Sequence, residues 1–193
     1  MLVLIVILLI LLVLLSSRER ATTLPSPKEH IEDDLCKLPL LKVTRNDTST
    51  LWNRTLKYEE VVWDISQELG VDYYLVFAII WTESSGRENV KRKEDSFYSY
   101  GLMQITLNAA RDVGFRGGWR ELMEPRTNIY YGTRYLSKLL SEWRNPVLAV
   151  AAYNAGTRRV KEWLGKGLKV EEFPNYRYIR RVASYYCILA KGE

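Results

Sequence analysis

The residue best suited to chemistry is Glu83, which ends an apolar run at residues 73–82. A carboxyl group at the end of a buried helix loses hydration, which disfavours the ionised form and raises its pKa. Such a group can act as the general acid that cleaves a glycosidic bond. Gly-Leu-Met-Gln-Ile at 101–105 and Ala-Tyr-Asn-Ala-Gly at 152–156 follow downstream. Together these segments indicate a sugar-cleaving site.

Several other classes of site are excluded by residue type. The one histidine, His30, lies in a polar stretch that contains prolines, outside the expected globular part. A Ser-His-Asp triad, a Cys-His pair or a Cys/His zinc site would need a histidine within the fold. The sequence also lacks a Gly-x-x-x-x-Gly-Lys-[Ser/Thr] phosphate loop, and Gly-Lys-Gly at 165–167 is typical of a helix end. We therefore expect neither a metal ion nor a cofactor.

The charge of the chain is mildly basic. Its 193 residues include 28 Lys and Arg against 23 Asp and Glu, which gives a net charge of +5. No long basic run of the kind found in nucleic-acid-binding tails is present. We expect no nucleic-acid partner. A basic surface could favour an acidic polymer or could simply be a solvated surface.

Residues 2–15 form an uninterrupted run of Leu, Ile and Val. As a helix this run would be about 21 Å long, against about 30 Å for a bilayer core. It lacks the preceding basic residues and the small-residue cleavage site of a typical signal peptide. We expect residues 1–17 to be either a signal peptide or a membrane anchor.

The rest of the chain divides into a linker and one domain. Residues 18–50 are rich in Ser, Thr, Pro and charge, so we expect a linker with little structure of its own. The domain is expected at 51–193. Cys36 and Cys187 flank it, and they could pair in an oxidising compartment or remain two thiols.

The domain is expected to be all-α. Apolar residues recur at helical spacing before Gly70, and Asp72 is placed to cap the next helix. Segment 87–99 is polar and is expected to be a flexible loop over a groove. Further helices are expected at 107–113, 128–143, 147–153, 158–164 and 175–189. No pair of alternating runs joined by a hairpin turn is apparent.

From about residue 58 to 186, the chain resembles the catalytic domain of soluble lytic transglycosylases, a goose-type-lysozyme-like helical fold with a glycan-binding groove. Four segments carry the resemblance in order: Glu83-Ser84, Gly-Leu-Met-Gln-Ile at 101–105, Pro125-x-x-Asn128-Ile129 leading into Gly132-x-x-Tyr135-Leu136, and Ala-Tyr-Asn-Ala-Gly at 152–156.

The resemblance implies cleavage of the MurNAc-GlcNAc β-1,4 bond of peptidoglycan, leaving 1,6-anhydro-MurNAc ends, with Glu83 as the single catalytic acid/base. It implies that Tyr153 orients or tunes Glu83, that Asn154 contacts substrate or fixes its loop, and that Met103 is a flexible apolar wall. The substrate-binding residues that it implies are Ser84, Met103, Gln104, Tyr153, Asn154 and Tyr178.

The resemblance also implies a location and partners. We expect the bacterial cell envelope, in the periplasm or outside the cytoplasm, with peptidoglycan glycan strands as the partner. Association with the inner membrane would follow if residues 1–17 are an anchor. The small domain with one groove is expected to be a monomer.

Two alternatives and one departure stay open. Asp95 could position a water molecule and make the domain a lysozyme-type hydrolase. The domain could also be a non-catalytic peptidoglycan-binding module of an envelope assembly. Pro174 stands where many relatives have a glutamate, and Glu171 or Glu172 could compensate for it.

Overall fold

The computed structural model describes residues 27–94 and 97–191. The chain forms two compact units, Met1–His30 and Ile31–Glu193, and only the start of helix α2 is described in the first. The α-helices are α2 (Pro27–Leu35), α3 (Arg45–Thr55), α4 (Glu59–Leu69), α5 (Tyr73–Ser84), α6 (Leu107–Asp112), α7 (Trp119–Met123), α8 (Pro125–Trp143), α9 (Pro146–Ala155), α10 (Thr157–Gly165) and α11 (Tyr176–Lys191).

The remaining elements are short. Two 3-10 helices are η1 (Leu56–Tyr58) and η2 (Val170–Glu172), and three strands are β1 (Lys91–Lys93), β2 (Tyr98–Tyr100) and β3 (Ile105–Thr106). The expected all-α class is confirmed as the dominant character of the fold. The five helices expected after residue 106 are present as α6, α8, α9, α10 and α11, although α8 begins at Pro125 rather than at residue 128.

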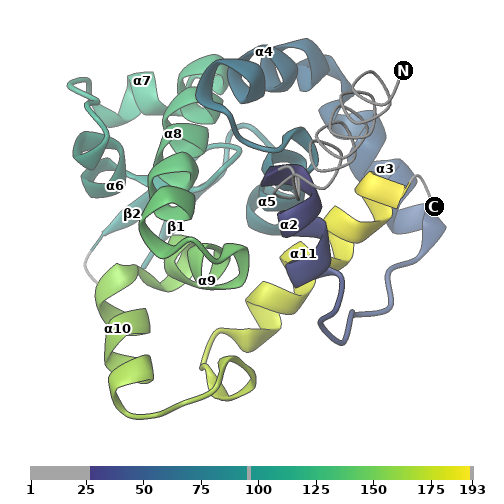
Figure 1. Cartoon of the computed structure of the whole chain (residues 1–193). Helices are drawn as coiled ribbons and strands as arrows, with labels where there is room; N and C mark the ends of the chain where they lie inside the picture. Colours follow the sequence, from purple (N-terminus) through teal and green to yellow (C-terminus); the bar gives the residue numbers. More distant parts are fainter. Residues whose placement is uncertain (1–26, 95–96, 192–193) are drawn as a thin grey trace, which may run out of the picture. The chain divides into compact units, whose positions relative to one another are not determined.

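Helix α5 lies in the hydrophobic core. Its start is fixed by Asp72, whose side chain accepts hydrogen bonds from the backbone N–H groups of Tyr74 and Leu75. Every residue from Leu75 to Trp81 is buried, as expected for a helix that is apolar on all sides. Helices α11 and α4 pack against α5, and Figure 1 shows α11 running beside it. This packing places Glu83, in the last turn of α5, at the end of a helix that is shielded from water.

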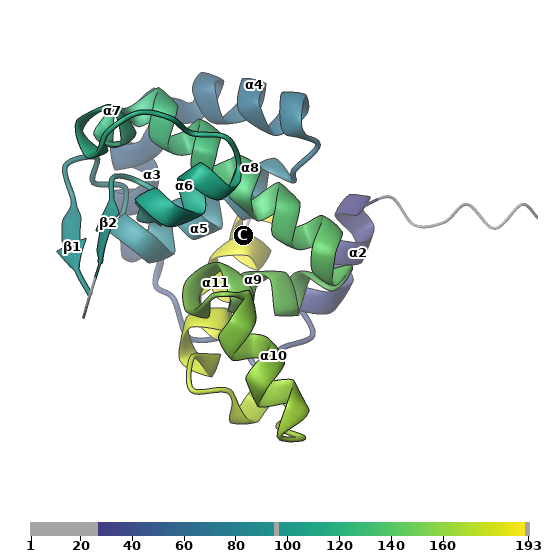
Figure 2. The same ribbon diagram turned by 90° about the vertical axis from the view of Figure 1, so that its left-hand side faces the viewer.

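A small antiparallel sheet lies in the segment that we expected to be a flexible loop. Strand β1 pairs with β2, and β2 pairs with β3. Figure 2 shows β1 and β2 side by side, with α7 close to β2. The prediction of a loop over residues 87–99 is wrong at Lys91–Lys93 and at Tyr98 and Ser99, because the charge of this segment hid its cross-strand pairing. The five-residue helix α7 was also not predicted, since so short an element has no clear periodicity.

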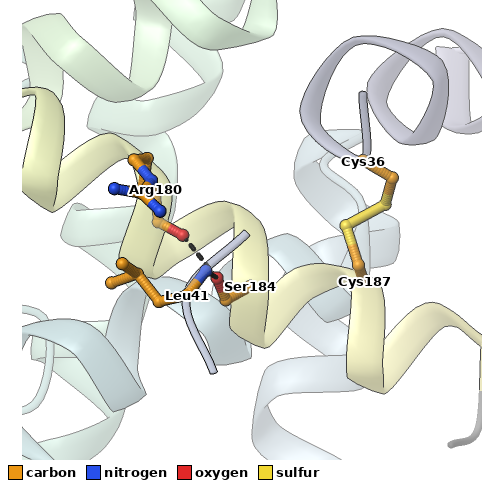
Figure 3. The surroundings of a disulfide bond; sticks show 5 residues. All are labelled: Cys36, Leu41, Arg180, Ser184 and Cys187. Atoms are coloured by element: carbon orange, nitrogen blue, oxygen red, sulfur yellow. Dashed lines mark hydrogen bonds between the residues drawn. A yellow bond between two sulfur atoms is a disulfide. The ribbon is translucent and has the colours of Figure 1, made fainter. Parts of the chain in front are cut away.

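The described part of the expected linker is structured. It contains α2 and the first half of α3, and the side chains of Ile31 and Leu35 are buried in the core. Cys36 forms a disulfide with Cys187 of α11, which answers the question that the sequence left open (Figure 3). This segment has few apolar residues, but Ile31 and Leu35 pack into the core and the disulfide ties the segment to α11.

The same segment is also held by a backbone contact. The Leu41 N–H donates a hydrogen bond of 2.7 Å to Ser184 Oγ on α11 (Figure 3). The apolar run of residues 2–15, expected as a signal peptide or anchor, lies outside the described residues. Among residues 27–94 and 97–191, no helix has the length and hydropathy needed to cross a membrane.

Candidate active site

Glu83 is a nearly buried carboxyl group with one direct hydrogen-bond donor. Its exposed fraction is only 8%, because α5 is packed on all sides. The hydroxyl of Tyr178, on α11, donates a hydrogen bond of 2.8 Å to Glu83 Oε1. The contact between α5 and α11 thus brings together two residues that the sequence predicted for the site.

The pKa of Glu83 is raised to about 7, and burial is the main cause. Removing the carboxylate from water disfavours its charge. The hydrogen bond from Tyr178 and the positive charge of Arg92 act in the opposite direction, while the negative charge of Glu94 raises the pKa further. Glu83 can therefore carry a proton at neutral pH and release it, as a general acid/base requires.

Arg92 is a site residue that sequence reasoning missed. Its Nη2 donates a hydrogen bond of 2.9 Å to the backbone carbonyl of Glu83, and its Nη1 lies 3.9 Å from Glu83 Oε2. Arg92 is the middle residue of β1, within a Lys-Arg-Lys run. No signal in the sequence pointed to it, because the paired strands in which Arg92 lies opposite Ser99 are only three residues long.

A cavity of about 560 Å³ opens beside Glu83. Of the predicted residues, Glu83, Gln104, Tyr153 and Asn154 line it. Tyr178 contacts Glu83 but is not part of the lining. The cavity also includes side chains that we did not predict, among them Arg92, Ser99, Tyr135, Arg158, Arg159, Trp163 and Asn175.

Gln104 lines the cavity in an unusual backbone conformation, with φ of +47°. Its Nε2 donates hydrogen bonds to the carbonyls of Val90 at 2.9 Å and Gly101 at 2.7 Å. Its Oε1 accepts a hydrogen bond of 3.0 Å from Ser99 Oγ. These contacts tie the loop to the sheet, so Gln104 shapes the wall of the cavity in addition to facing it.

Tyr153 and Asn154 come from the end of α9. The Tyr153 hydroxyl donates to the carbonyl of Met103 at 3.0 Å, whereas the hydrogen bond to Glu83 comes from Tyr178. Burial, and then the nearby charge of Glu83, raise the pKa of Tyr153 well above its usual value, so it remains a neutral phenol. The exposed Asn154 accepts a hydrogen bond of 3.2 Å from Asn175 Nδ2.

Met103 and Ser84, which the resemblance implied as substrate-binding residues, do not line the cavity, and their roles in binding substrate stay predictions. The Met103 side chain is fully buried, and the Thr133 hydroxyl lies 3.7 Å from its sulfur. Ser84 is also buried, and its hydroxyl donates to the carbonyl of Ile80 at 3.1 Å. Met103 points into the core because its loop turns at Gln104, and Ser84 lies on the inner side of α5.

Asn128, in the third segment of the resemblance, forms a hydrogen bond with Met103 in the second. Its Oδ1 accepts from Met103 N, and its Nδ2 donates to the carbonyls of Tyr100 and Leu122, each at 2.8 Å. Gly101 has φ of +72°, and a Cβ there would lie 2.4 Å from Asn128 Nδ2. The absence of a side chain at Gly101 therefore lets buried Asn128 hold the loop that presents Gln104.

The structure describes three of the four residues on which the open alternatives and the departure from the family depend. Asp95 lies outside the described residues. Pro174 lines the cavity, whereas Glu171 and Glu172 do not, and the carboxylate of Glu172 accepts a hydrogen bond of 2.8 Å from Lys169 N. Within residues 27–94 and 97–191, no group of three or more Cys, His, Asp or Glu side chains could hold a metal ion.

Two curated relatives illustrate the similarity in sequence. The soluble lytic murein transglycosylase of Salmonella typhimurium is 31% identical over 138 residues, which cover 65% of this chain and 21% of the relative. The membrane-bound lytic murein transglycosylase C of Sodalis glossinidius is 34% identical over 122 residues, covering 55% of this chain and 33% of the relative. The chain thus spans about a fifth to a third of the length of these relatives.

Solved structures agree with this similarity. An inactive mutant of the lytic transglycosylase Slt from Pseudomonas aeruginosa matches with a TM-score of 0.61 and 28% identity, covering 69% of this chain and 24% of that one. The 70 kDa soluble lytic transglycosylase in complex with bulgecin A matches with a TM-score of 0.63 and 26% identity, covering 74% of this chain and 26% of that one. These matches confirm the predicted lysozyme-like helical fold.

A family model for the transglycosylase SLT domain matches residues 61–173, which include most of the cavity lining and all four segments of the resemblance. With Glu83 at the end of α5, the loop of Gln104 and the end of α9 gathered around one cavity, the chain belongs to the transglycosylase SLT domain family.

Proposed function

We propose that this chain is a peptidoglycan lytic transglycosylase, a lyase that cleaves the MurNAc-GlcNAc β-1,4 glycosidic bond with Glu83 as its single acid/base. The observation that carries the proposal is the buried Glu83 carboxyl group, with a pKa of about 7, which lines a cavity of about 560 Å³. Membership in the family and the names of the relatives support the same reaction.

In the first step, protonated Glu83 donates its proton to the glycosidic oxygen. The bond between C1 of MurNAc and this oxygen breaks, GlcNAc leaves with the proton, and positive charge develops at C1. The N-acetyl group of the same MurNAc can share this charge as an oxazolinium-like species. Glu83 becomes a carboxylate, which the Tyr178 hydroxyl and the Arg92 guanidinium stabilise.

In the second step, the Glu83 carboxylate removes the proton from the C6 hydroxyl of the same ring. The C6 oxygen then attacks C1 and closes the 1,6-anhydro ring, and Glu83 is again protonated for the next cycle. No water molecule is consumed. A pKa of about 7 suits both steps, because neither the acid nor the carboxylate is strongly disfavoured near neutral pH.

We also propose that the protein works in the bacterial cell envelope, outside the cytoplasm, on peptidoglycan glycan strands. The relatives are named murein transglycosylases, and one of them is named membrane-bound. Residues 1–17, as signal peptide or anchor, would deliver or hold the domain there. The disulfide between Cys36 and Cys187 fits an oxidising compartment. A small single domain is consistent with a monomer.

The test is mass spectrometry of the fragments that the whole chain releases from purified peptidoglycan, compared with Glu83→Gln. Glu68→Gln is a matched control, since Glu68 is an exposed glutamate of α4. We expect anhydro-muropeptides from the wild type and from the control, and none from Glu83→Gln. Circular dichroism must show that all three proteins are folded.

Two other outcomes would contradict the proposal. Hydrated, reducing-end fragments that disappear in Asp95→Asn would make the domain a lysozyme-type hydrolase. No fragments from a folded wild type that still binds peptidoglycan would make it a non-catalytic binding module.

A further inference from the structure

The hairpin of β1 and β2 has two faces with different composition. Arg92 and Ser99 pair across the strands, and both line the catalytic cavity. Side chains alternate between the two faces of a strand. The flanking residues of the same hairpin therefore face away from the cavity, and their paired positions are Lys91 with Tyr100 and Lys93 with Tyr98. None of these four lines the cavity.

An aromatic cluster lies on this second face. The ring centroids of Tyr98 and Tyr100 are 6.4 Å apart, and those of Tyr100 and Trp119 are 6.2 Å apart. Trp119 comes from α7, which lies close to β2 (Figure 2). Tyr100 is buried, but Tyr98 is 40% exposed and Trp119 is 37% exposed. Large aromatic side chains that remain exposed together often mark an interaction site.

Two cations lie against the same rings. Lys91 Nζ is 4.4 Å from the centroid of Tyr98 and 4.6 Å from that of Trp119, and the Arg120 guanidinium is 4.6 Å from that of Trp119. Among the described residues, neither Lys91 nor Arg120 forms an ion pair with a carboxylate. The nearby Glu121 carboxylate accepts a hydrogen bond from Gly118 N within the cap of α7. The positive charge is thus available to a ligand.

We call Lys91, Tyr98, Tyr100, Trp119 and Arg120 the hairpin aromatic surface, and we propose that it is a second binding site for peptidoglycan, separate from the catalytic cavity. Sugar rings present flat C–H faces that pack on exposed aromatic rings. The peptides of peptidoglycan carry carboxylates that match the two cations. The identity of this polymer rests on the proposed function.

The chemistry of this surface could also suit single-stranded nucleic acid, which stacks on aromatic rings beside cations. Peptidoglycan is favoured because the same two strands form a wall of the cavity in which the glycan is cleaved. In an insoluble wall, neighbouring strands lie close together, so the two faces of one hairpin can contact two parts of the same polymer. The surface would then hold the domain on the wall while the cavity acts.

The test measures sedimentation of the whole chain with insoluble peptidoglycan, in a Glu83→Gln background so that the polymer stays intact. We expect Trp119→Ala and Tyr98→Ala each to weaken binding about five- to tenfold. Trp63→Ala is the matched control, because Trp63 is a more exposed tryptophan (54%) on α4 that packs against Tyr73. It should bind like its parent. With Glu83 restored, both surface variants should cleave short soluble glycan fragments at the parent rate.

Thermal unfolding shows whether Trp119→Ala folds. If it does not, Tyr98→Ala decides the outcome. Undiminished sedimentation of folded surface variants, or an equal loss in Trp63→Ala, would overturn the inference. It would also be overturned if the variants lost binding to single-stranded DNA but kept binding to peptidoglycan. The proposed function fails separately, through the absence of anhydro products from the wild type.

Discussion

Glu83 is an acidic side chain held almost out of water, and its protonation state is therefore coupled to the stability of the fold. Its pKa is raised from 4.5 in the unfolded chain to about 7 in the native state. Between pH 4.5 and about pH 7, the native state therefore binds more protons than the unfolded state. The contribution of Glu83 to stability is fully present below about pH 4.5 and is lost as the pH rises through 7.

Glu83→Gln should remove this pH dependence. Because glutamine carries no charge, we expect the variant to be more stable than the wild type by roughly 3 kcal/mol at about pH 8, with the difference shrinking toward pH 4. Urea unfolding of both proteins across this range measures the difference, and all other titrating groups are common to both. A difference that does not change with pH would contradict the assignment.

Tyr178→Phe should change the pH dependence of cleavage. The Tyr178 hydroxyl donates to Glu83 Oε1 and favours the carboxylate, so its loss should raise the pKa of Glu83 further. In the proposed mechanism, cleavage requires protonated Glu83, so the fall in rate on the alkaline side should move upward by about one pH unit. The measurement is the initial rate on peptidoglycan as a function of pH.

Tyr185→Phe provides the control for this experiment. Tyr185 lies on the same helix, α11, and its ring packs edge-on against Trp81 without contacting Glu83. For this variant, the rate should fall at the same alkaline pH as for the wild type. If Tyr178→Phe also leaves this pH unchanged, the group that titrates is not Glu83.

Between elements, α8 packs tightly against the loop of Met103. Gly132 of α8 lies directly over this side chain, and a Cβ there would be 2.5 Å from Met103 Sδ and 2.8 Å from its Cβ. Both atoms would have to move in a packed core. The glycine thus allows α8 to approach the loop that carries Gln104.

Gly132→Ala should destabilise the protein by about 1–3 kcal/mol through this overpacking, even though alanine favours a helix. Gly165→Ala is the matched control, since Gly165 is also helical and a Cβ there would meet nothing within 4 Å. That substitution should be neutral or stabilising. Equal unfolding midpoints for the two variants in urea would show that the contact with Met103 does not limit how closely α8 can approach the loop.

The elements also show how far the sequence could be interpreted. Asp72 predicted the start of α5 and Gly70 the end of α4, because caps and left-handed residues act locally. The resemblance implied Tyr178 only as a substrate-binding residue, and its contact with Glu83 was not predicted, since 95 positions separate the two residues. Arg92 was missed because the strand pairing that aims it at Glu83 involves only three residues on each side.

Met103 shows a different limit. The resemblance placed it in the groove, but its side chain is fully buried, whereas the adjacent Gln104 lines the cavity. Composition and spacing do not show which of two adjacent side chains faces a cavity, so the sequence could not tell the position of Met103 from that of Gln104. The role of this segment in binding substrate stays a prediction.

At the scale of the whole molecule, the disulfide joins residues that are 151 positions apart. Closing so long a loop removes conformational entropy from the unfolded chain, worth up to about 5 kcal/mol by the chain-entropy model. The bond fixes the segment before residue 51 to the last helix (Figure 3). It lies away from the cavity lining.

Replacing both cysteines, with Cys36→Ser and Cys187→Ser, should therefore lower the free energy of unfolding by several kcal/mol, up to about 5. Urea unfolding with and without a reducing agent measures the effect. The wild type should lose stability on reduction, whereas the double variant should not respond. A wild type that is equally stable in both conditions would contradict a structural role for the bond.

The central claim is that Glu83 directs the C6 hydroxyl of the sugar, and not water, to C1. The most direct measurement is digestion of peptidoglycan by the whole chain in water labelled with the heavy isotope of oxygen, followed by mass spectrometry. We expect 1,6-anhydro ends that carry no label from the wild type, and no such ends from Glu83→Gln. Labelled reducing ends from the wild type would mean that water attacks C1 and would contradict this claim.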